Sequence, residues 1–301
     1  MSKILVCGLT NVETTVKIDK FPLDYCPIDY SFFGINSYPA GVGLNLALAF
    51  NSLSDEVVFL SMVGDDSAGK VIKETLIANN ISTDYLLKTE YSAQSVVLYD
   101  KEGSRRIFCD LKDFQEKDFS KELFEKASAD CDTLCLCNIN FSRSLLKIAK
   151  EMGKTIACDV HTLSDINDEY NRDYMKNADI LFLSNENIKG KEEQFLLSLK
   201  DEYFSKVIVI GMGKNGAMLY CRKDDKIYNV PAVKTREVVN TVGAGDALFS
   251  SFVHFYTKGF DAYKSLQYAT VFASYKIGES GAAKGFLNEN DLLSIAKQIY
   301  K

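Results

Sequence analysis

The chain has 301 residues, 47% of them hydrophobic, which is enough for one large buried core. Its formal net charge of -6 argues against a nucleic-acid groove or an anionic membrane surface as a partner, and no apolar run approaches the roughly 18 residues of a membrane span. The eight cysteines contain no C-x-x-C pair and the apolar start at residues 4–9 is too short for a signal peptide, so we expect a cytoplasmic protein with reduced thiols.

Strand and helix patterns alternate along most of the chain. Apolar runs predict strands at 3–9, 57–62, 133–137, 155–158, 180–183 and 207–210. Helical periodicity predicts helices at 44–53, 68–79, 142–152, 170–177, 191–203, 247–258, 261–277 and 290–299. This alternation predicts an α/β fold, with a central, doubly wound, mostly parallel sheet covered by helices on both faces.

Two insertions interrupt the alternation. Residues 12–38 begin as a half-exposed strand and continue with aromatic residues that follow no helical period. Residues 95–100 and 104–111 form a second pair of strands, joined by Lys-Glu-Gly. We expect the insertions 12–38 and 95–111 to stand off the main sheet as a small β lid. No linker separates independent units, so the sequence predicts a single domain over 1–301.

The most informative stretch is 240–246, which reads Asn-Thr-Val-Gly-Ala-Gly-Asp between an extended, β-favouring segment at 230–239 and an apolar helix. A Gly-Ala-Gly turn at a helix start leaves backbone N–H groups free for an anion, and the helix dipole adds to this. Asp246, in the first helical turn, is suited to accept a proton from a hydroxyl. The pattern indicates phosphoryl transfer to an alcohol. The alternative is that the glycines only shape a loop and Asp246 is a helix-start carboxylate.

Three further glycine-containing motifs accompany this stretch. Residues 40–45, Ala-Gly-Val-Gly-Leu-Asn, enter a helix, and Asn45 offers a donor and an acceptor to a polyol; the alternative is a plain helix-capping loop. Residues 63–69 are expected to cap the next helix. Residues 211–216 spell G-x-G-x-x-G, but the β-like segment 217–221 follows, which favours a hairpin over a dinucleotide site. The alternative is a simple Asn-Gly turn.

Together these motifs, in this order between residues 8 and 282, strongly resemble the PfkB, or ribokinase-like, carbohydrate kinases. The resemblance implies a ribokinase-like fold and transfer of the γ-phosphoryl group of Mg-ATP to a hydroxymethyl group of a sugar. It implies that Asp246 is the general base and that the backbone of Gly243, Ala244 and Gly245 forms an anion hole. It places the acceptor sugar at Asn11, Glu13, Gly41, Gly43 and Asn45. It places the nucleotide at Asn185, Gly213, Gly216, Thr241, Thr270, Gly281 and Ala282.

The chain departs from the family pattern at several positions. Glu13 replaces an Asp and reaches one methylene further towards the acceptor. Ile188 replaces the Glu of an Asn-x-x-Glu motif associated with Mg²⁺, which leaves Glu186 to act through water or to be an exposed glutamate after a strand. Asn240 replaces an Asp that helps several members bind a monovalent cation, and this argues against potassium activation.

Two other functions stay open from the sequence. A nucleoside kinase has the same fold, and the aromatic residues of 25–38 could stack on a base. A degenerate sensor would bind sugar or nucleotide without turnover; Ile188 and Asn240 motivate that idea, and the intact Asp246 weighs against it. The expected partners are ATP and a sugar or nucleoside, without nucleic acid or membrane, and a second copy of the chain paired through the β lid.

Overall fold

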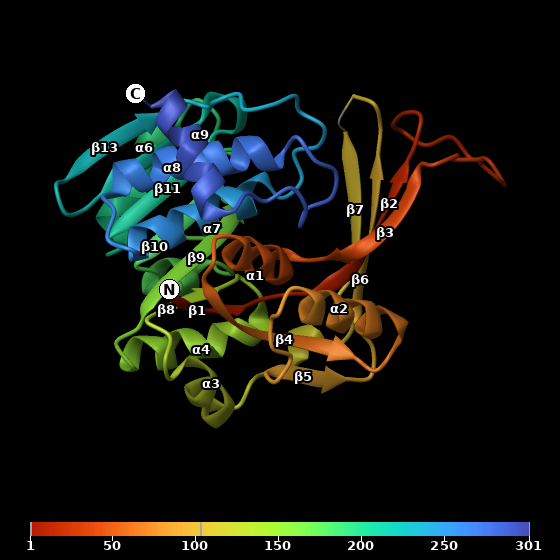
Figure 1. The fold of residues 1–301 in the computed structure, drawn as a ribbon, viewed down its shortest axis with the longest axis horizontal. Helices are drawn as coiled ribbons and strands as arrows, with labels where there is room; N and C mark the ends of the chain where they lie inside the picture. The colour runs from red at the N-terminus through yellow and green to blue at the C-terminus, as the bar shows by residue number, and fades with distance from the viewer. Residues whose placement is uncertain (1, 103, 301) are drawn as a thin grey trace.

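The computed structural model describes residues 2–102 and 104–300, and its body is a nine-stranded sheet (Figure 1). The strand order is β13-β12-β11-β10-β9-β8-β1-β4-β5. All neighbours from β5 to β11 are parallel, whereas β12 and β13 are antiparallel. The strands are β1 (Lys3–Cys7), β4 (Glu56–Gly64), β5 (Leu86–Thr89), β8 (Thr133–Leu136), β9 (Thr155–Thr162), β10 (Ile180–Ser184), β11 (Val207–Gly211), β12 (Ala217–Cys221) and β13 (Lys226–Val230).

Helices cover both faces of this sheet. They are α1 (Val42–Ser52), α2 (Ser67–Ala78), α3 (Lys121–Ser128), α4 (Asn140–Glu151), α5 (Arg172–Asn177), α6 (Glu192–Glu202), α7 (Ala244–Thr257), α8 (Ala262–Lys276) and α9 (Glu289–Ile299). Successive residues of β1 pack into two different cores, Leu5 against the side covered by α3 to α6 and Val6 against the side covered by α1, α2, α7 and α8. The predicted doubly wound α/β architecture is therefore confirmed.

A second, four-stranded sheet stands beside the body, at the right of Figure 1, and we call it the lid. Its order is β3 (Ile35–Ala40), β2 (Asn11–Lys17), β6 (Ala93–Tyr99) and β7 (Arg105–Asp110), and the central pair β2 and β6 is parallel. It thus joins the two segments that the sequence set apart. Gly103, which the prediction placed between the strands β6 and β7, lies outside the described residues.

Several element predictions were wrong in detail. The extended segment expected at 230–239 contains only the end of β13, because Pro231 follows and the backbone then docks on the end of α8, where Val239 and Asn240 donate to the Ile277 carbonyl. The sequence missed β5, α3 and β13, which are short. Strand β1 ends at Cys7, whereas β9 runs on to Thr162.

Two motif predictions are confirmed in form. Strands β11 and β12 are antiparallel neighbours, so the G-x-G-x-x-G stretch is the turn of a hairpin. Asp66 caps α2, accepting from the Gly69 N–H at 2.7 Å, and it also accepts from the Ser92 N–H at 2.9 Å. This second bond ties the α2 start to the segment that enters β6.

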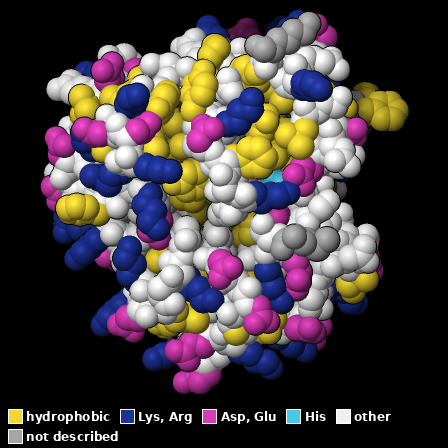
Figure 2. Space-filling view, turned by 60° about the vertical axis from the view of Figure 1, so that its left-hand side comes forward, with side chains coloured by type: hydrophobic (Ala, Val, Ile, Leu, Met, Phe, Trp, Pro, Cys, Tyr) yellow, Lys and Arg dark blue, Asp and Glu magenta, His cyan; other side chains and the backbone are white. Residues whose placement is uncertain are grey.

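The surface mixes charges of both signs, as the face in Figure 2 shows. Within the described part of the chain, no helix is long and apolar enough to cross a membrane. The same residues contain no group of three or more His, Cys, Asp or Glu side chains placed to hold a metal ion.

Candidate active site

The first turn of α7 presents Asp246 to the start of α1. Gly243 precedes the helix with φ 77°, a left-handed conformation that favours glycine, and Asp246 follows in the first turn. The Asn45 side chain in α1 donates from Nδ2 to Asp246 Oδ2 at 2.6 Å. The structure thus joins two side chains that lie 201 positions apart in the sequence.

The surroundings of Asp246 favour a proton acceptor. Burial raises the pKa of Asp246, and the charge of Asp159 raises it further, whereas the Asn45 hydrogen bond and the positive charges of His161 and Lys276 lower it. Its side chain keeps some exposed area although it lies deep within the fold. A carboxylate with a raised pKa is a better base near neutral pH than an ordinary aspartate.

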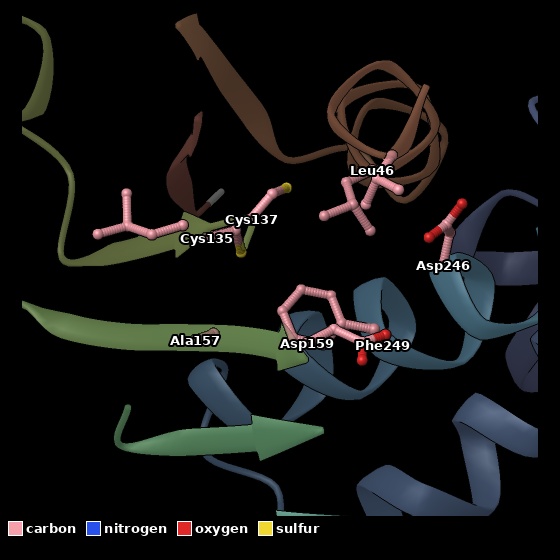
Figure 3. Close-up of a pocket in the computed structure, with 9 residues that line it drawn as sticks. Leu46, Cys135, Cys137, Ala157, Asp159, Asp246 and Phe249 are labelled. Carbon is pink, nitrogen blue, oxygen red and sulfur yellow. The ribbon is translucent and has the colours of Figure 1, made fainter. Parts of the chain in front are cut away.

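Asp246 also borders a small, mostly apolar cavity at the carboxyl ends of β8 and β9 (Figure 3). Asp159, which belongs to β9, lines one side of this cavity, and Figure 3 shows it on the same side as Phe249. The other lining residues are Val42, Leu46, Cys135, Leu136, Cys137 and Ala157. Ligands of open α/β sheets bind at the carboxyl ends of the strands, and this cavity is lined by Leu136 and Cys137 at the end of β8.

Two buried amide oxygens near these elements have no hydrogen-bond partner among the described residues. They are Oδ1 of Asn11, at the start of the lid strand β2, and Oδ1 of Asn45. Their amide nitrogens are engaged, that of Asn11 with Ser95 Oγ at 3.0 Å and that of Asn45 with Asp246. A buried acceptor without a donor costs stability, so both oxygens are suited to hydroxyl groups of a ligand.

The lid face that carries Asn11 also carries Glu13, since alternate residues of a strand share a face. Glu13 is in register with Tyr38 on β3 and Ser95 on β6, and Tyr38 Oη donates to Glu13 Oε1 at 3.3 Å. Burial raises the pKa of Glu13, against the lowering effects of Tyr38 and Arg105. This face therefore offers a row of hydroxyl, carboxylate and amide groups.

The glycines of the two loops have different surroundings. A Cβ on Gly245 would meet no heavy atom within 4 Å, so its backbone faces open space, as an anion hole requires. A Cβ on Gly243 would lie 2.4 Å from the Ala282 carbonyl oxygen. On Gly41 and Gly43 it would lie 2.6 Å from the Leu9 carbonyl oxygen and 2.5 Å from the Gly8 carbonyl carbon, so packing alone already requires these two glycines.

The backbone donors of the expected anion hole are not equivalent. The Ala244 N–H donates to the Thr241 carbonyl at 3.2 Å, whereas the Gly245 N–H has no backbone acceptor in the described chain. Thr241 is exposed beside them. Gly245 is therefore the readiest donor for an anion.

Five other residues expected at the nucleotide lie in three places. Gly281 and Ala282 lie beside Gly243, and a Cβ on Gly281 would be 3.8 Å from the Tyr38 ring, so this turn connects the lid to the α7 start. Gly213 is exposed, with no atom within 4 Å of its Cβ position, whereas Gly216 packs on the Val230 carbonyl. Thr270 lies on α8, where its hydroxyl is 2.8 Å from Tyr300 Oη.

The Asn185 region contains a carboxylate that the sequence did not single out. Asn185 Nδ2 donates to Glu192 Oε1, in the first turn of α6, at 2.7 Å. Glu186 is exposed. Mg²⁺ is usually held by one or two carboxylates together with substrate phosphates, so these residues suit an ion that arrives with a nucleotide.

Tyr38, Glu192 and Lys276 are the site residues that sequence reasoning missed. Tyr38 occupies one of the alternating positions of a lid strand, and Glu192 stands seven positions after Asn185. Neither spacing distinguishes these two residues from ordinary surface residues. Lys276 ends a helix, where lysine is common, and only the structure shows that it is buried. Asp159 and His161 lie in the second half of β9, which ends at Thr162.

The comparisons with known proteins identify the family and the fold. The family model "pfkB family carbohydrate kinase" matches residues 1–289. The chain therefore belongs to the pfkB family of carbohydrate kinases. It has the fold of ribokinase, as its likeness to solved ribokinase structures shows.

Individual relatives differ in what they phosphorylate. A ribokinase from Dictyostelium discoideum is 24% identical over 324 residues, covering 97% of this chain and 99% of that protein. A nucleoside kinase from Methanocaldococcus jannaschii is 23% identical over 93% of this chain and 92% of its own length. The structure of Arabidopsis thaliana ribokinase complexed with ribose and ATP superposes with a TM-score of 0.84 at 19% identity, covering 99% of each chain.

Proposed function

We propose that this protein transfers the γ-phosphoryl group of ATP to a hydroxymethyl group of a sugar. The hydrogen bond between Asn45 and Asp246 is the observation that carries this proposal. It places the helix-start carboxylate of one motif against the polyol-binding residue of the other, with an unpartnered amide oxygen on Asn45 beside it. A base and a hydroxyl-binding group at one point are what an alcohol acceptor needs.

In the proposed reaction, the acceptor hydroxyl gives its proton to Asp246 as its oxygen bonds to the γ-phosphorus. The bond from that phosphorus to the β-phosphate oxygen breaks, and ADP leaves. Asn45 holds the Asp246 carboxylate in place. The N–H groups at the α7 start, that of Gly245 above all, face the charge on the moving phosphoryl group. The positive end of the α7 dipole acts in the same direction.

The acceptor would lie between the lid and the carboxyl end of the sheet. Asn11 and Glu13 would bind it from the lid, with Tyr38 and Ser95 beside them. Asn45 would bind it from α1. Gly41 and Gly43 would shape the turn that brings Asn45 into place, because both pack tightly on the chain at residues 8–9.

ATP would lie between the β11–β12 turn and the 281–282 turn. Gly213, Gly216, Thr241, Gly281 and Ala282 would line it there, and Thr270 would need to exchange its contact with Tyr300. Asn185 and Glu192, with the exposed Glu186, would hold Mg²⁺ next to the phosphates. The ion would neutralise phosphate charge, and the chain's own groups would hold the acceptor and take the proton.

A panel of sugars and nucleosides, scored for ADP formation, tests this proposal. We expect turnover with at least one sugar and loss of it in Asp246→Asn. Turnover with nucleosides only would favour the second candidate, a nucleoside kinase. One observation supports that candidate: Tyr30 and Phe32 in the lid loop stack on one another and are mostly exposed, as surfaces that accept a base can be. No turnover with any alcohol would leave a binding sensor.

A further inference from the structure

Lys276 is a buried cation for which the reaction described above has no use. It is the last residue of α8, and its side chain has 0% exposed area. Lysine is almost never fully buried unless it is paired, because its ammonium group loses strong hydration. The buried ammonium group of Lys276 therefore requires a partner that compensates for its lost hydration.

The partner is the turn that leads into α7. Lys276 Nζ donates a hydrogen bond to the Val242 carbonyl oxygen. The Val242 N–H donates to Asn240 Oδ1 at 2.8 Å, so both backbone polar groups of this residue are engaged by side chains. The N–H groups of Val239 and Asn240 donate to the Ile277 carbonyl at 2.9 and 3.0 Å. The end of α8 thus holds the turn at several points, and Lys276 provides the charged contact nearest to Gly243 among them.

Val242 directly precedes the anion-hole loop. Any shift of its carbonyl moves Gly243, which already packs on Ala282, and with it the N–H groups that follow. The Lys276 ammonium also attracts the Asp246 carboxylate, and the Glu279 carboxylate attracts the ammonium in turn. The cation therefore lies at the turn that directly precedes the anion-hole loop, on the Val242 carbonyl oxygen.

We propose that Lys276 is a positioning residue for phosphoryl transfer: a built-in cation that fixes the turn before Gly243 and places a positive charge next to the anion-hole loop. This inference rests on the proposed kinase function and deepens it. In this role, the Lys276 side chain provides a fixed positive charge near the transferred phosphoryl group.

The energetics favour a functional over a structural role. Burial lowers the pKa of Lys276 to about 8, assisted by Arg236, while the attractions of Asp246 and Glu279 oppose that shift. Between pH 8 and the ordinary value of 10.5, the unfolded chain binds more protons than the folded chain, so stability rises with pH. Below that window the charged lysine costs stability. A residue kept only for stability would not carry this cost.

The same geometry bears on monovalent cations. The residue at 240 is Asn, without the charge of the Asp that the resemblance associates with such an ion, and an ammonium group from the chain already lies on the turn that residue 240 begins. We therefore expect wild-type turnover to be unchanged when K⁺ is replaced by Na⁺ in the assay. A strong dependence on K⁺ would contradict the built-in cation.

Lys276→Met is the direct test, because it removes the charge at similar volume. Exposed Lys297, on α9, provides the matched control as Lys297→Met. We expect kcat to fall about 10- to 100-fold in Lys276→Met and to stay unchanged in the control, since hydrogen bonds from charged groups are worth that much. Lys276→Ala should regain part of its kcat when ammonium chloride is added, and the wild type should not respond.

A pH profile separates positioning from mere structure. Wild-type kcat should fall as pH rises through about 8, where Lys276 loses its proton, and Lys276→Met should lack this limb. A Lys276→Met protein with the wild-type kcat and the same alkaline limb would overturn the inference. If that variant does not fold, the pKa of Lys276 can be measured in the wild type by NMR, with the Lys276 signal assigned by its loss in Lys276→Arg. This pKa is then compared with the pH at which wild-type kcat falls. A mismatch between the two would overturn it as well.

Binding of a non-hydrolysable ATP analogue distinguishes failure here from failure of the proposed function. If the wild type phosphorylates no alcohol, the kinase proposal fails, but analogue binding can still be measured by calorimetry. The inference survives when Lys276→Met binds the analogue at least tenfold more weakly than the wild type and Lys297→Met does not. It fails when all three proteins bind it equally.

Discussion

At the scale of single residues, the site depends on one carboxylate in an environment that disfavours its charge. Asp246 is surrounded by protein and has Asp159 as a neighbour, and both raise its pKa. The compensation comes from Asn45, His161 and Lys276. This arrangement makes Asp246 a stronger base and lowers the stability of the folded protein. A substitution of Asp246 is therefore expected to change both stability and turnover.

Asp246→Asn should lower turnover about 10²- to 10⁴-fold and raise the melting temperature near neutral pH. The folded carboxyl has the higher pKa, so between the unfolded and folded values the unfolded chain binds fewer protons, and stability falls as pH rises through that window. Asparagine removes this cost and keeps the shape. Steady-state kinetics and thermal unfolding at several pH values measure both effects. Retention of half the turnover would rule out Asp246 as the base.

Glu13 should determine acceptor binding. Hydrogen bonds to a buried charge are worth about 1.5–3 kcal/mol, so Glu13→Ala should weaken acceptor binding about 10- to 150-fold, with little change for ATP. Glu13→Asp retracts the carboxylate from Tyr38, and we expect it to impair the natural acceptor and to improve ribose-like ones. Acceptor titration calorimetry distinguishes the three proteins. Equal affinities would make Glu13 only a residue on the solvent side of a lid strand.

At the scale of elements, the start of α7 contacts three other parts of the molecule. It meets α1 through Asn45, the 281–282 turn through Gly243 and the end of α8 through Val242. Two glycines two positions apart therefore have different roles. One is required for packing, and the other leaves space for a ligand.

Gly245→Val should abolish ATP use and leave thermal unfolding close to that of the wild type, because its side chain would extend into open space in front of the helix. Gly243→Ala is the matched contrast. Its Cβ would lie 2.4 Å from the Ala282 carbonyl oxygen, and φ is 77°, so the variant should unfold at a clearly lower temperature. If Gly245→Val keeps the wild-type apparent affinity for ATP, the phosphates bind elsewhere.

Elements with a strong period could be predicted from sequence, and short or docked ones could not. Continuous apolar runs were sufficient to predict β10 and β11, and the glycine spacing of 211–216 together with the β-like residues after it was sufficient to predict a hairpin. Segment 231–239 was misjudged because its conformation is set by contact with Ile277, which no local pattern records. For the same reason, the sequence indicated Asp246 and Asn45 separately, while Lys276 and Glu192 emerged only from tertiary contacts.

At the scale of the whole molecule, the lid leaves apolar side chains in contact with solvent. On the face opposite Glu13, Ile35, Val96 and Phe108 are 59%, 38% and 47% exposed. Strand β7 is at the edge of its sheet and has exposed residues along its length. Exposed apolar patches and open strand edges are features of association surfaces.

We predict that two copies of the chain pair through this lid face. Phe108→Asp should shift sedimentation equilibrium towards monomer, because it places a charge within the apolar patch that pairing would bury. Phe204→Asp is the control, since Phe204 is 86% exposed and lies after α6, away from the lid. A wild type that sediments as a monomer over the accessible concentration range would contradict this pairing.

The 201-residue separation between Asn45 and Asp246 also has a consequence for how the protein is made. While a ribosome is still adding residues before α7, the lid and the first helices can exist, yet no acceptor site can be complete. Closing so long a chain segment is entropically costly, and the last helices must dock before it is repaid. Acceptor sugar is therefore expected to recognise only finished molecules. A saturating sugar, at about 100 times its Kd, would then add about 2.7 kcal/mol to the stability of those molecules and none to nascent chains.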